Sequence, residues 1–129
     1  MIRQPFLFTF RIHIQRNNIM RLLSRKEEML LLAVWKLQDN EGAYGVTIRR
    51  YIEKKSGIRW LFGAIYGPLG RLVDHGYVES FESEPLPERG GRRRVLYRLT
   101  GAGKKELLRV KELHTSLWMD VHSLEDKNL

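Results

Sequence analysis

The sequence contains no cysteine, and no apolar run approaches the roughly 20 residues that a membrane-spanning helix requires. The first absence excludes a disulfide framework and a thiolate metal site, and it fits a reducing compartment such as the cytoplasm. No nucleophile stands beside a base, no pair of carboxylates has a catalytic spacing, and no glycine-rich segment precedes a Lys-Ser or Lys-Thr pair. His114 and His122 have no acidic or cysteine partner at metal-ligand spacing. We therefore expect no enzyme activity, no cofactor, no metal and no membrane contact.

Acidic residues are outnumbered by basic ones, 15 to 23, which gives a formal net charge of +8 over 129 residues. Between Arg89 and Lys111 there are nine basic residues and one acid, Glu106, whereas residues 79–88 hold four acids and no base. A run of one charge can be a solvated surface, but here it coincides with a predicted strand and the start of a predicted helix. The positive charge therefore favours a polyanionic partner, and double-stranded DNA is favoured over an anionic membrane.

Three segments in the first two thirds of the chain have the apolar spacing of helices. Ser24 and Glu27 have the spacing of a capping box, and helical spacing continues to Asn40. The turn EGAYG precedes a second helix over residues 46–56, and a third is predicted over residues 62–75 with a glycine stop after it. The buried stripe of the third helix is predicted to be Ile65, Leu69, Leu72 and Val73.

Two segments alternate with the period of strands, residues 77–82 and 94–99. The loop between them, residues 83–91, holds two prolines and a Gly-Gly pair, which indicates a long hairpin tip. Three helices followed by a hairpin with basic flanks make a helix-turn-helix with a wing. The predicted fold class is thus mainly α with a small β-hairpin (α+β), a winged helix-turn-helix with a long C-terminal dimerisation helix.

The last helix is predicted to start after a Thr100 cap and to run over residues 101–126, about 39 Å at 1.5 Å per residue. A helix of that length is too long to pack entirely on so small a domain, so its apolar stripe predicts a homodimer. The predicted dimer interface consists of Leu107, Val110, Leu113, Leu117, Val121 and Leu124.

The predicted helices and strands divide the chain into three regions. Residues 20–100 form the winged helix-turn-helix, and residues 101–129 form the dimerisation helix. Residues 1–19 alternate like a strand without a strand partner and are interpreted as a poorly ordered N-terminal extension. Because Met20 opens a segment of the usual size for this architecture, the extension is either a longer or a misassigned start.

Four stretches resemble the PadR-like transcriptional regulators over about residues 24–118. They are MLLLAVWKLQDNEGAYGVTIRRYIE, WLFGAIYGPLGRLVDHGYV, GGRRRVLYRLT and GAGKKEL. The resemblance implies a homodimeric repressor of transcription that binds a palindromic operator. The chain departs from the family where many members have hydroxyl residues before Tyr66 and proline directly after it, since here Phe62, Gly63 and Ala64 precede the tyrosine and Gly67 separates it from Pro68.

The DNA-contacting residues are predicted from the third helix, the segment before it and the wing. They are Arg59, Trp60, Gly63, Ala64, Tyr66, Arg71, Arg92, Arg93 and Arg94. Tyr66 is either an aromatic at the edge of the core or a hydroxyl donor to a phosphate or base edge. The glycines of the third helix, Gly63, Gly67 and Gly70, either let the backbone approach DNA or reflect packing against another helix. Strand alternation sends Arg92 and Arg94 to one face and Arg93 to the other.

Trp118 lies beside the stripe of the last helix and has two interpretations. It either packs in the dimer interface or forms a flat wall for a small aromatic effector, with Trp35 as a second wall. A different function for the whole chain also stays open, because a winged helix with few donors on its third helix can serve as a protein-interaction module.

Overall fold

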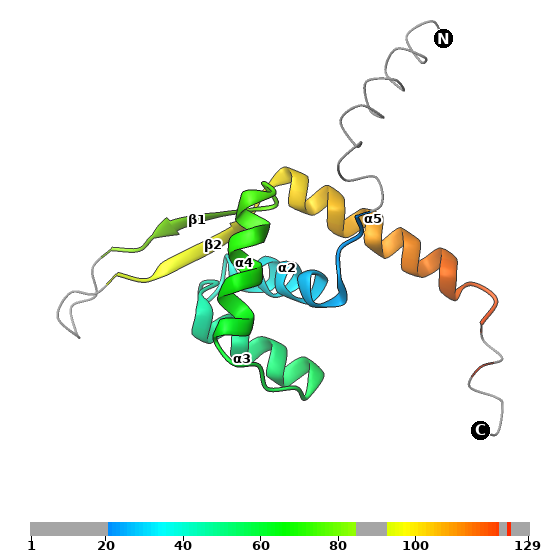
Figure 1. Ribbon diagram of the computed structural model, residues 1–129, viewed down its shortest axis with the longest axis horizontal. Helices are drawn as coiled ribbons and strands as arrows, with labels where there is room; N and C mark the ends of the chain where they lie inside the picture. Colours follow the sequence, from blue (N-terminus) through cyan, green and yellow to red (C-terminus); the bar gives the residue numbers. More distant parts are fainter. Residues whose placement is uncertain (1–20, 85–92, 122–123, 125–129) are drawn as a thin grey trace, which may run out of the picture.

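The computed structural model describes residues 21–84, 93–121 and 124. The helices are α2 (Arg25–Leu37), α3 (Gly45–Ser56), α4 (Gly63–Asp74) and α5 (Gly101–Trp118), and the strands are β1 (Val78–Glu82) and β2 (Val95–Leu99) (Figure 1). Four helices and one antiparallel hairpin confirm the predicted fold class. The strand-like segment over residues 1–19, the tip of the wing and Arg92 lie outside the described residues.

The start of α2 is fixed by the predicted capping box. The Glu27 backbone N–H donates to the Ser24 Oγ at 3.1 Å, and the Ser24 N–H donates back to Glu27 Oε1 at 2.9 Å. The helix ends at Leu37, before the predicted Asn40, because Gly42 adopts a φ of 93° and its N–H donates to the Leu37 carbonyl at 2.9 Å. A left-handed glycine thus closes the helix where apolar spacing alone would extend it.

The core lies where α2, α3, α4 and the hairpin meet. The third-helix stripe is buried as predicted at Ile65, Leu69 and Leu72, with Val73 only partly buried. The other fully or nearly fully buried apolar residues are Leu30, Leu31, Ala33, Val34, Leu37, Ala43, Ile48, Ile52, Val78, Tyr97, Leu99 and Val110. Because each helix contributes one stripe to this core, the opposite face of α4 is left on the surface.

The hairpin is pinned to the helices along β2. Val78 pairs with Leu99 and Glu82 with Val95 in an antiparallel register. The Tyr97 N–H donates to the Ala43 carbonyl at 2.8 Å, and the Leu99 N–H donates to the Gln38 side-chain carbonyl at 2.8 Å. The turn between α2 and α3 therefore aligns the wing with the helix-turn-helix.

Helix α5 starts at the predicted Thr100 cap, whose Oγ1 accepts the Gly103 N–H at 3.0 Å. The prediction of a helix over residues 101–126 was wrong at its C-terminal end, since the helix stops at Trp118 and Asp120 takes a φ of 70°. Eighteen residues span about 27 Å. Figure 1 shows α5 packed along α2, with its C-terminal end on the side of the molecule opposite the hairpin.

Candidate nucleic-acid interface

The outer face of α4 is largely bare backbone. Gly63, Gly67 and Gly70 are exposed there, and none has a positive φ that would require glycine. A Cβ placed on Gly63 or Gly70 meets nothing within 4 Å, and on Gly67 it meets only Arg71 Nη1 at 3.8 Å. Among the described residues, no helix packs against this face. Packing within the chain therefore does not explain three glycines that each cost the helix about 1 kcal/mol relative to alanine.

Tyr66 lies at the junction of α4 and the start of α3. Its side chain is about half exposed, and its hydroxyl rests so closely over Gly45 that a Cβ on Gly45 would overlap it. Burial raises the pKa of the Tyr97 phenol, and the nearby Tyr66 raises it further, so the phenol of Tyr97 is neutral at physiological pH. The Tyr66 ring is therefore partly exposed on the surface, whereas its hydroxyl is turned toward Gly45 of its own chain.

Phe62 extends this aromatic surface toward α3. Its ring stacks on Tyr66 with centroids 6.2 Å apart, and the Arg49 guanidinium lies 4.5 Å from the Phe62 ring centroid. A shallow cleft of about 200 Å³ beside it is lined by Val46, Arg49, Arg50, Glu53, Arg59 and Phe62. The predicted contact Arg59 therefore joins arginines of α3 at one site.

The wing arginines described by the structure contact different groups. The Arg94 guanidinium lies 4.4 Å from the ring centroid of Tyr44, the residue before α3. Arg93 reaches Glu82 of β1, with 3.8 Å between Nη1 and Oε1. The Arg94 backbone N–H donates to Ser83 Oγ at 2.9 Å, which holds the base of the wing in place. Arg94 is thereby directed toward the helix-turn-helix and Arg93 along the hairpin.

These contacts form one continuous strip that we call the basic–aromatic surface: Arg94, Tyr44, Tyr66, Phe62 and Arg49. Tyr44 and Gly45 are consecutive, so the wing contact and the α4 contact meet at the first residues of α3. Sequence reasoning missed Tyr44 and Arg49 as site residues. The outward position of Arg49 on the second helix was the available signal.

The remaining predicted DNA contacts have different surroundings. Trp60 is half-buried and packs against the core, with Lys26 Nζ 5.1 Å from its ring centroid. Ala64 is partly buried in the first turn of α4, and Arg71 is exposed in the last turn. Arg98 of β2 belongs to the basic run but pairs with Asp39 at 2.7 Å. Part of the positive charge is thus neutralised within the chain.

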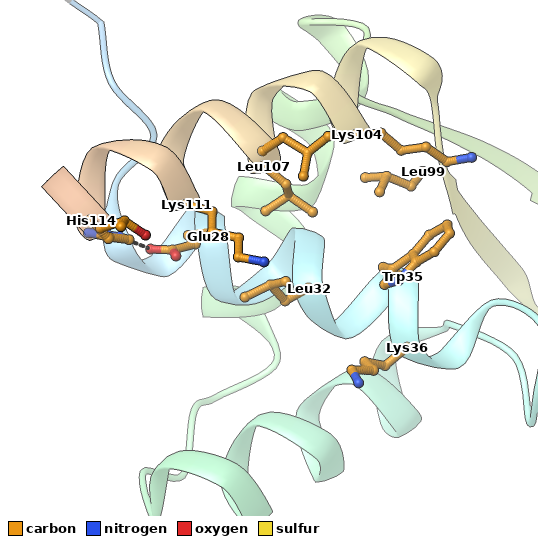
Figure 2. Close-up of a pocket in the computed structure, with 11 residues that line it drawn as sticks. Glu28, Leu32, Trp35, Lys36, Leu99, Lys104, Leu107, Lys111 and His114 are labelled. Atoms are coloured by element: carbon orange, nitrogen blue, oxygen red, sulfur yellow. Dashed lines mark hydrogen bonds and ion pairs between the residues drawn. The ribbon is translucent and has the colours of Figure 1, made fainter.

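A second apolar surface lies between α2 and α5. A cleft of about 590 Å³ lies there. Figure 2 shows Leu32 and Trp35 from α2 facing Leu107 from α5 across it. Lys36, Lys104 and Lys111 also line this cleft, which we call the α2–α5 cleft. Its Lys104 Nζ lies 5.0 Å from the Trp35 ring centroid, and a His114–Glu28 contact of 3.2 Å closes one end.

The predicted dimer stripe divides into two parts. Val110 is 4% exposed and Leu107 packs on the core, so both contact their own chain, and Leu113 is half-buried. Leu117 is 64% and Leu124 45% exposed, whereas Val121 is partly buried in the turn after α5. Trp118 is also exposed but does not line the α2–α5 cleft with Trp35. Within one chain, the two tryptophans do not form the predicted pair of walls.

No helix in the described part of the chain has both the length and the apolarity to cross a membrane. No group of three or more histidine, cysteine, aspartate or glutamate side chains there could hold a metal ion.

A helix-turn-helix whose third helix has a bare outer face, followed by an arginine-flanked hairpin, defines a winged helix-turn-helix protein. Residues 31–109 match the family described as the transcriptional regulator PadR-like family. Because this match spans more than half of the sequence, the chain belongs to the PadR-like family of transcriptional regulators. The family is one of DNA-binding regulators and not an enzyme class.

Solved structures share the fold. The chain is similar to a PadR-like transcription factor from Bacteroides fragilis, with 24% identity over 78% of this chain and 92% of that one and a TM-score of 0.62. A PadR family regulator from Clostridium difficile is 20% identical over 81% and 100% of the two chains, with a TM-score of 0.60. A PadR-like regulator from Bacillus cereus is 20% identical over 79% and 92%, with a TM-score of 0.62. No curated protein matches the sequence significantly.

Proposed function

We propose that this protein is a cytoplasmic, dimeric repressor that binds a palindromic operator in duplex DNA through α4 and the wing. The observation that carries the proposal is the basic–aromatic surface, which joins the start of α3, the exposed face of α4 and the base of the wing. A recognition helix enters the major groove with its N-terminal residues at base edges, while arginines on flanking elements hold the phosphates.

The proposed role of each residue in DNA binding follows from its position in α3, α4 or the wing. Gly63, Gly67 and Gly70 let the α4 backbone approach the groove closely, since they carry no side chain and need none for the fold. Arg49 beside Phe62 at the start of α4 and Arg94 beside Tyr44 contact phosphates, as does Arg71 at the C-terminal end of the helix. Arg92 is proposed to act with Arg94 from the wing.

The operator can be found by selection. The full chain is used to recover duplexes from a randomised library, and the recovered sequences are footprinted with the protein. Two inverted half-sites are expected, with centres one helical turn apart, about 34–36 Å, or a multiple of it. Arg49→Ala should weaken binding, whereas Arg25→Ala, which removes the same charge outside the basic–aromatic surface, should not. Recovered duplexes that share no motif and bind no better than the starting pool would refute a specific operator.

We propose that the dimer forms through the outer side of α5 and the turn after it. Leu117, Trp118 and Met119 are each more than 60% exposed there and are next to one another in sequence. Large apolar side chains gathered on one helix end favour burial against a second copy. Sedimentation of the full chain as a monomer at micromolar concentration would contradict this.

We further propose that a small aromatic effector releases the operator. The α2–α5 cleft offers an apolar wall at Trp35 and extends along α5 to Thr115, three residues before Trp118 of the proposed dimer interface. An effector shifts DNA binding only if it prefers the dimer geometry that misplaces the α4 helices. Titration of tryptophan fluorescence with a panel of planar aromatic compounds, repeated on Trp35→Ala and Trp118→Ala, tests the site. A panel that changes neither emission nor operator affinity leaves both tryptophans as packing residues.

The alternative function is a protein-interaction module that uses the same exposed apolar groups. It is favoured by the small number of hydrogen-bond donors on the outer face of α4. Affinity for duplex DNA that is weak and insensitive to salt would support this alternative, because phosphate contacts make DNA binding strongly salt-dependent.

A further inference from the structure

Leu61, in the segment leading into α4, is the most exposed large apolar residue in the described part of the chain. Its side chain is 78% exposed, and Ile58 nearby is 55% exposed. The backbone of Leu61 is held in place by the first turn of α4. The Ala64 N–H donates to the Leu61 carbonyl at 2.9 Å, and the Ile65 N–H donates to the Phe62 carbonyl at 2.9 Å. The leucine is therefore presented to the outside at a fixed place.

The groups around Leu61 offer few ways to read a base by hydrogen bonding. The first turn of α4 contributes Gly63 and Ala64, which have no polar side-chain atom, and the Tyr66 hydroxyl rests over Gly45. The N-terminal end of a recognition helix is nevertheless the part that meets base edges. In the major groove the thymine C5-methyl group is the apolar feature that an apolar side chain can recognise.

The charges around the apolar residues identify the partner. Arg49, Arg50 and Arg59 line the adjoining cleft with a single acid, Glu53. Arg49 stands over the Phe62 ring at 4.5 Å, so cationic and apolar groups share one surface. A polyanion that displays methyl groups matches this combination better than an apolar protein surface does.

We propose that Leu61, supported by Phe62, reads thymine methyl groups in the major groove and so sets the sequence preference of this protein. The inference rests on the proposed DNA-binding function and names the base feature that is recognised. Each half-site then carries at least one thymine whose methyl group contacts Leu61, and that position tolerates 5-methylcytosine better than cytosine.

The experiment replaces thymine with deoxyuridine, which removes only the methyl group. The probe is the duplex selected from the randomised library, remade with deoxyuridine at one symmetric pair of thymines at a time. Loss of one methyl contact should weaken binding about fourfold per half-site at the critical thymine. Leu61→Ala should bind the thymine duplex and the deoxyuridine duplex equally well.

Leu22→Ala is the matched control, since Leu22 is an exposed leucine ahead of α2 and 51% exposed. It should discriminate thymine from deoxyuridine as the wild type does. Because Leu61 is exposed, its truncation should leave the melting temperature nearly unchanged, and Leu61→Met should retain discrimination.

Two results would overturn the inference while leaving the proposed function intact. One is wild-type binding that is strong and salt-dependent but indifferent to deoxyuridine at every thymine. The other is a Leu61→Ala variant that loses the same factor of affinity on both duplexes and so still discriminates thymine from deoxyuridine, which would make Leu61 a shape or backbone contact. Absence of duplex binding by the wild type would instead refute the proposed function itself.

Discussion

The two exposed apolar regions of this molecule differ in what surrounds them. Around the start of α4, Leu61 and Phe62 are accompanied by arginines and by exposed glycines. In the α2–α5 cleft, Leu32 and Trp35 are accompanied by lysines, and no described glycine lies among the lining residues. Planar guanidinium groups beside bare backbone suit close contact with phosphates and bases. Bulky aliphatic walls with flexible lysines at the rim suit a second chain or a small molecule.

Helix α5 carries two kinds of apolar side chain, one buried against its own domain and one exposed. Val110 faces its own domain and contributes to folding, whereas Leu117 is exposed and is proposed to contribute to association. Substitutions at the two positions should therefore have different consequences, although both residues belong to the same predicted stripe.

The largest expected effect is the loss of the dimer on Leu117→Glu. Burial of a leucine contributes at least about 1.5 kcal/mol in each copy, so the dissociation constant should rise about a hundredfold or more. Val110→Ala should instead lower the free energy of unfolding and leave association less affected. Sedimentation velocity and chemical unfolding of both variants measure the two outcomes. A Leu117→Glu chain that remains dimeric would place the interface elsewhere.

The next largest effect is expected at Gly70. Gly70→Ala should raise the free energy of unfolding by about 1 kcal/mol, because nothing lies within 4 Å of the new methyl group. The same change should weaken DNA binding, since the methyl group separates α4 from the groove. Gly101→Ala adds an equally unopposed methyl group on α5 and serves as the control. Equal DNA affinity of Gly70→Ala and wild type would mean that this face does not approach DNA.

A smaller effect is expected from Tyr66→Phe. Because the hydroxyl rests over Gly45, its loss should affect DNA only through the position of the ring beside Phe62, so we expect a small fall in operator affinity and little change in melting temperature. The same loss should partly rescue Gly45→Ala, which places a methyl group against that hydroxyl. A large fall in melting temperature with unchanged affinity would assign Tyr66 to the core instead.

The smallest effect concerns pH and the cap of α2. Burial alone would raise the pKa of Glu27, but hydrogen bonds from Ser24 and Arg21 outweigh it and lower the pKa below its ordinary value. The stabilisation is therefore fully present above the unfolded-state pKa and is lost as pH falls through the folded-state pKa. Glu27→Gln should flatten this acid limb in unfolding experiments, and Arg21→Ala should reproduce part of the loss. An acid limb that is identical in all three proteins would contradict the assignment.

The sequence was sufficient for features that depend on neighbours along the chain. The Ser24 capping box, the stripe at Ile65, Leu69 and Leu72, and the Thr100 cap all follow from local spacing. The end of α5 was not predictable in this way, because Val121 and Leu124 continue the helical spacing after the chain has turned at Asp120.

Features that depend on tertiary contacts could be predicted less well. The Arg98–Asp39 pair joins residues far apart in the chain, so a charge count assigned that arginine to the free basic run. The basic–aromatic surface needs the wing folded back onto Tyr44, which no local pattern encodes. The separation of Trp118 from the cleft at Trp35 has the same cause.

The salt dependence of duplex binding is the most direct test of whether the wing contacts DNA phosphates. The logarithm of the affinity is measured against the logarithm of salt concentration for the wild type, Arg94→Ala and Arg98→Ala. Among the described residues Arg94 pairs with no acid and stands over Tyr44, whereas Arg98 on β2 is paired with Asp39 at 2.7 Å. We expect Arg94→Ala to reduce the slope of log affinity against log salt concentration by about one unit and Arg98→Ala to leave that slope unchanged. Equal slopes and affinities for wild type and Arg94→Ala would contradict a wing that contacts DNA.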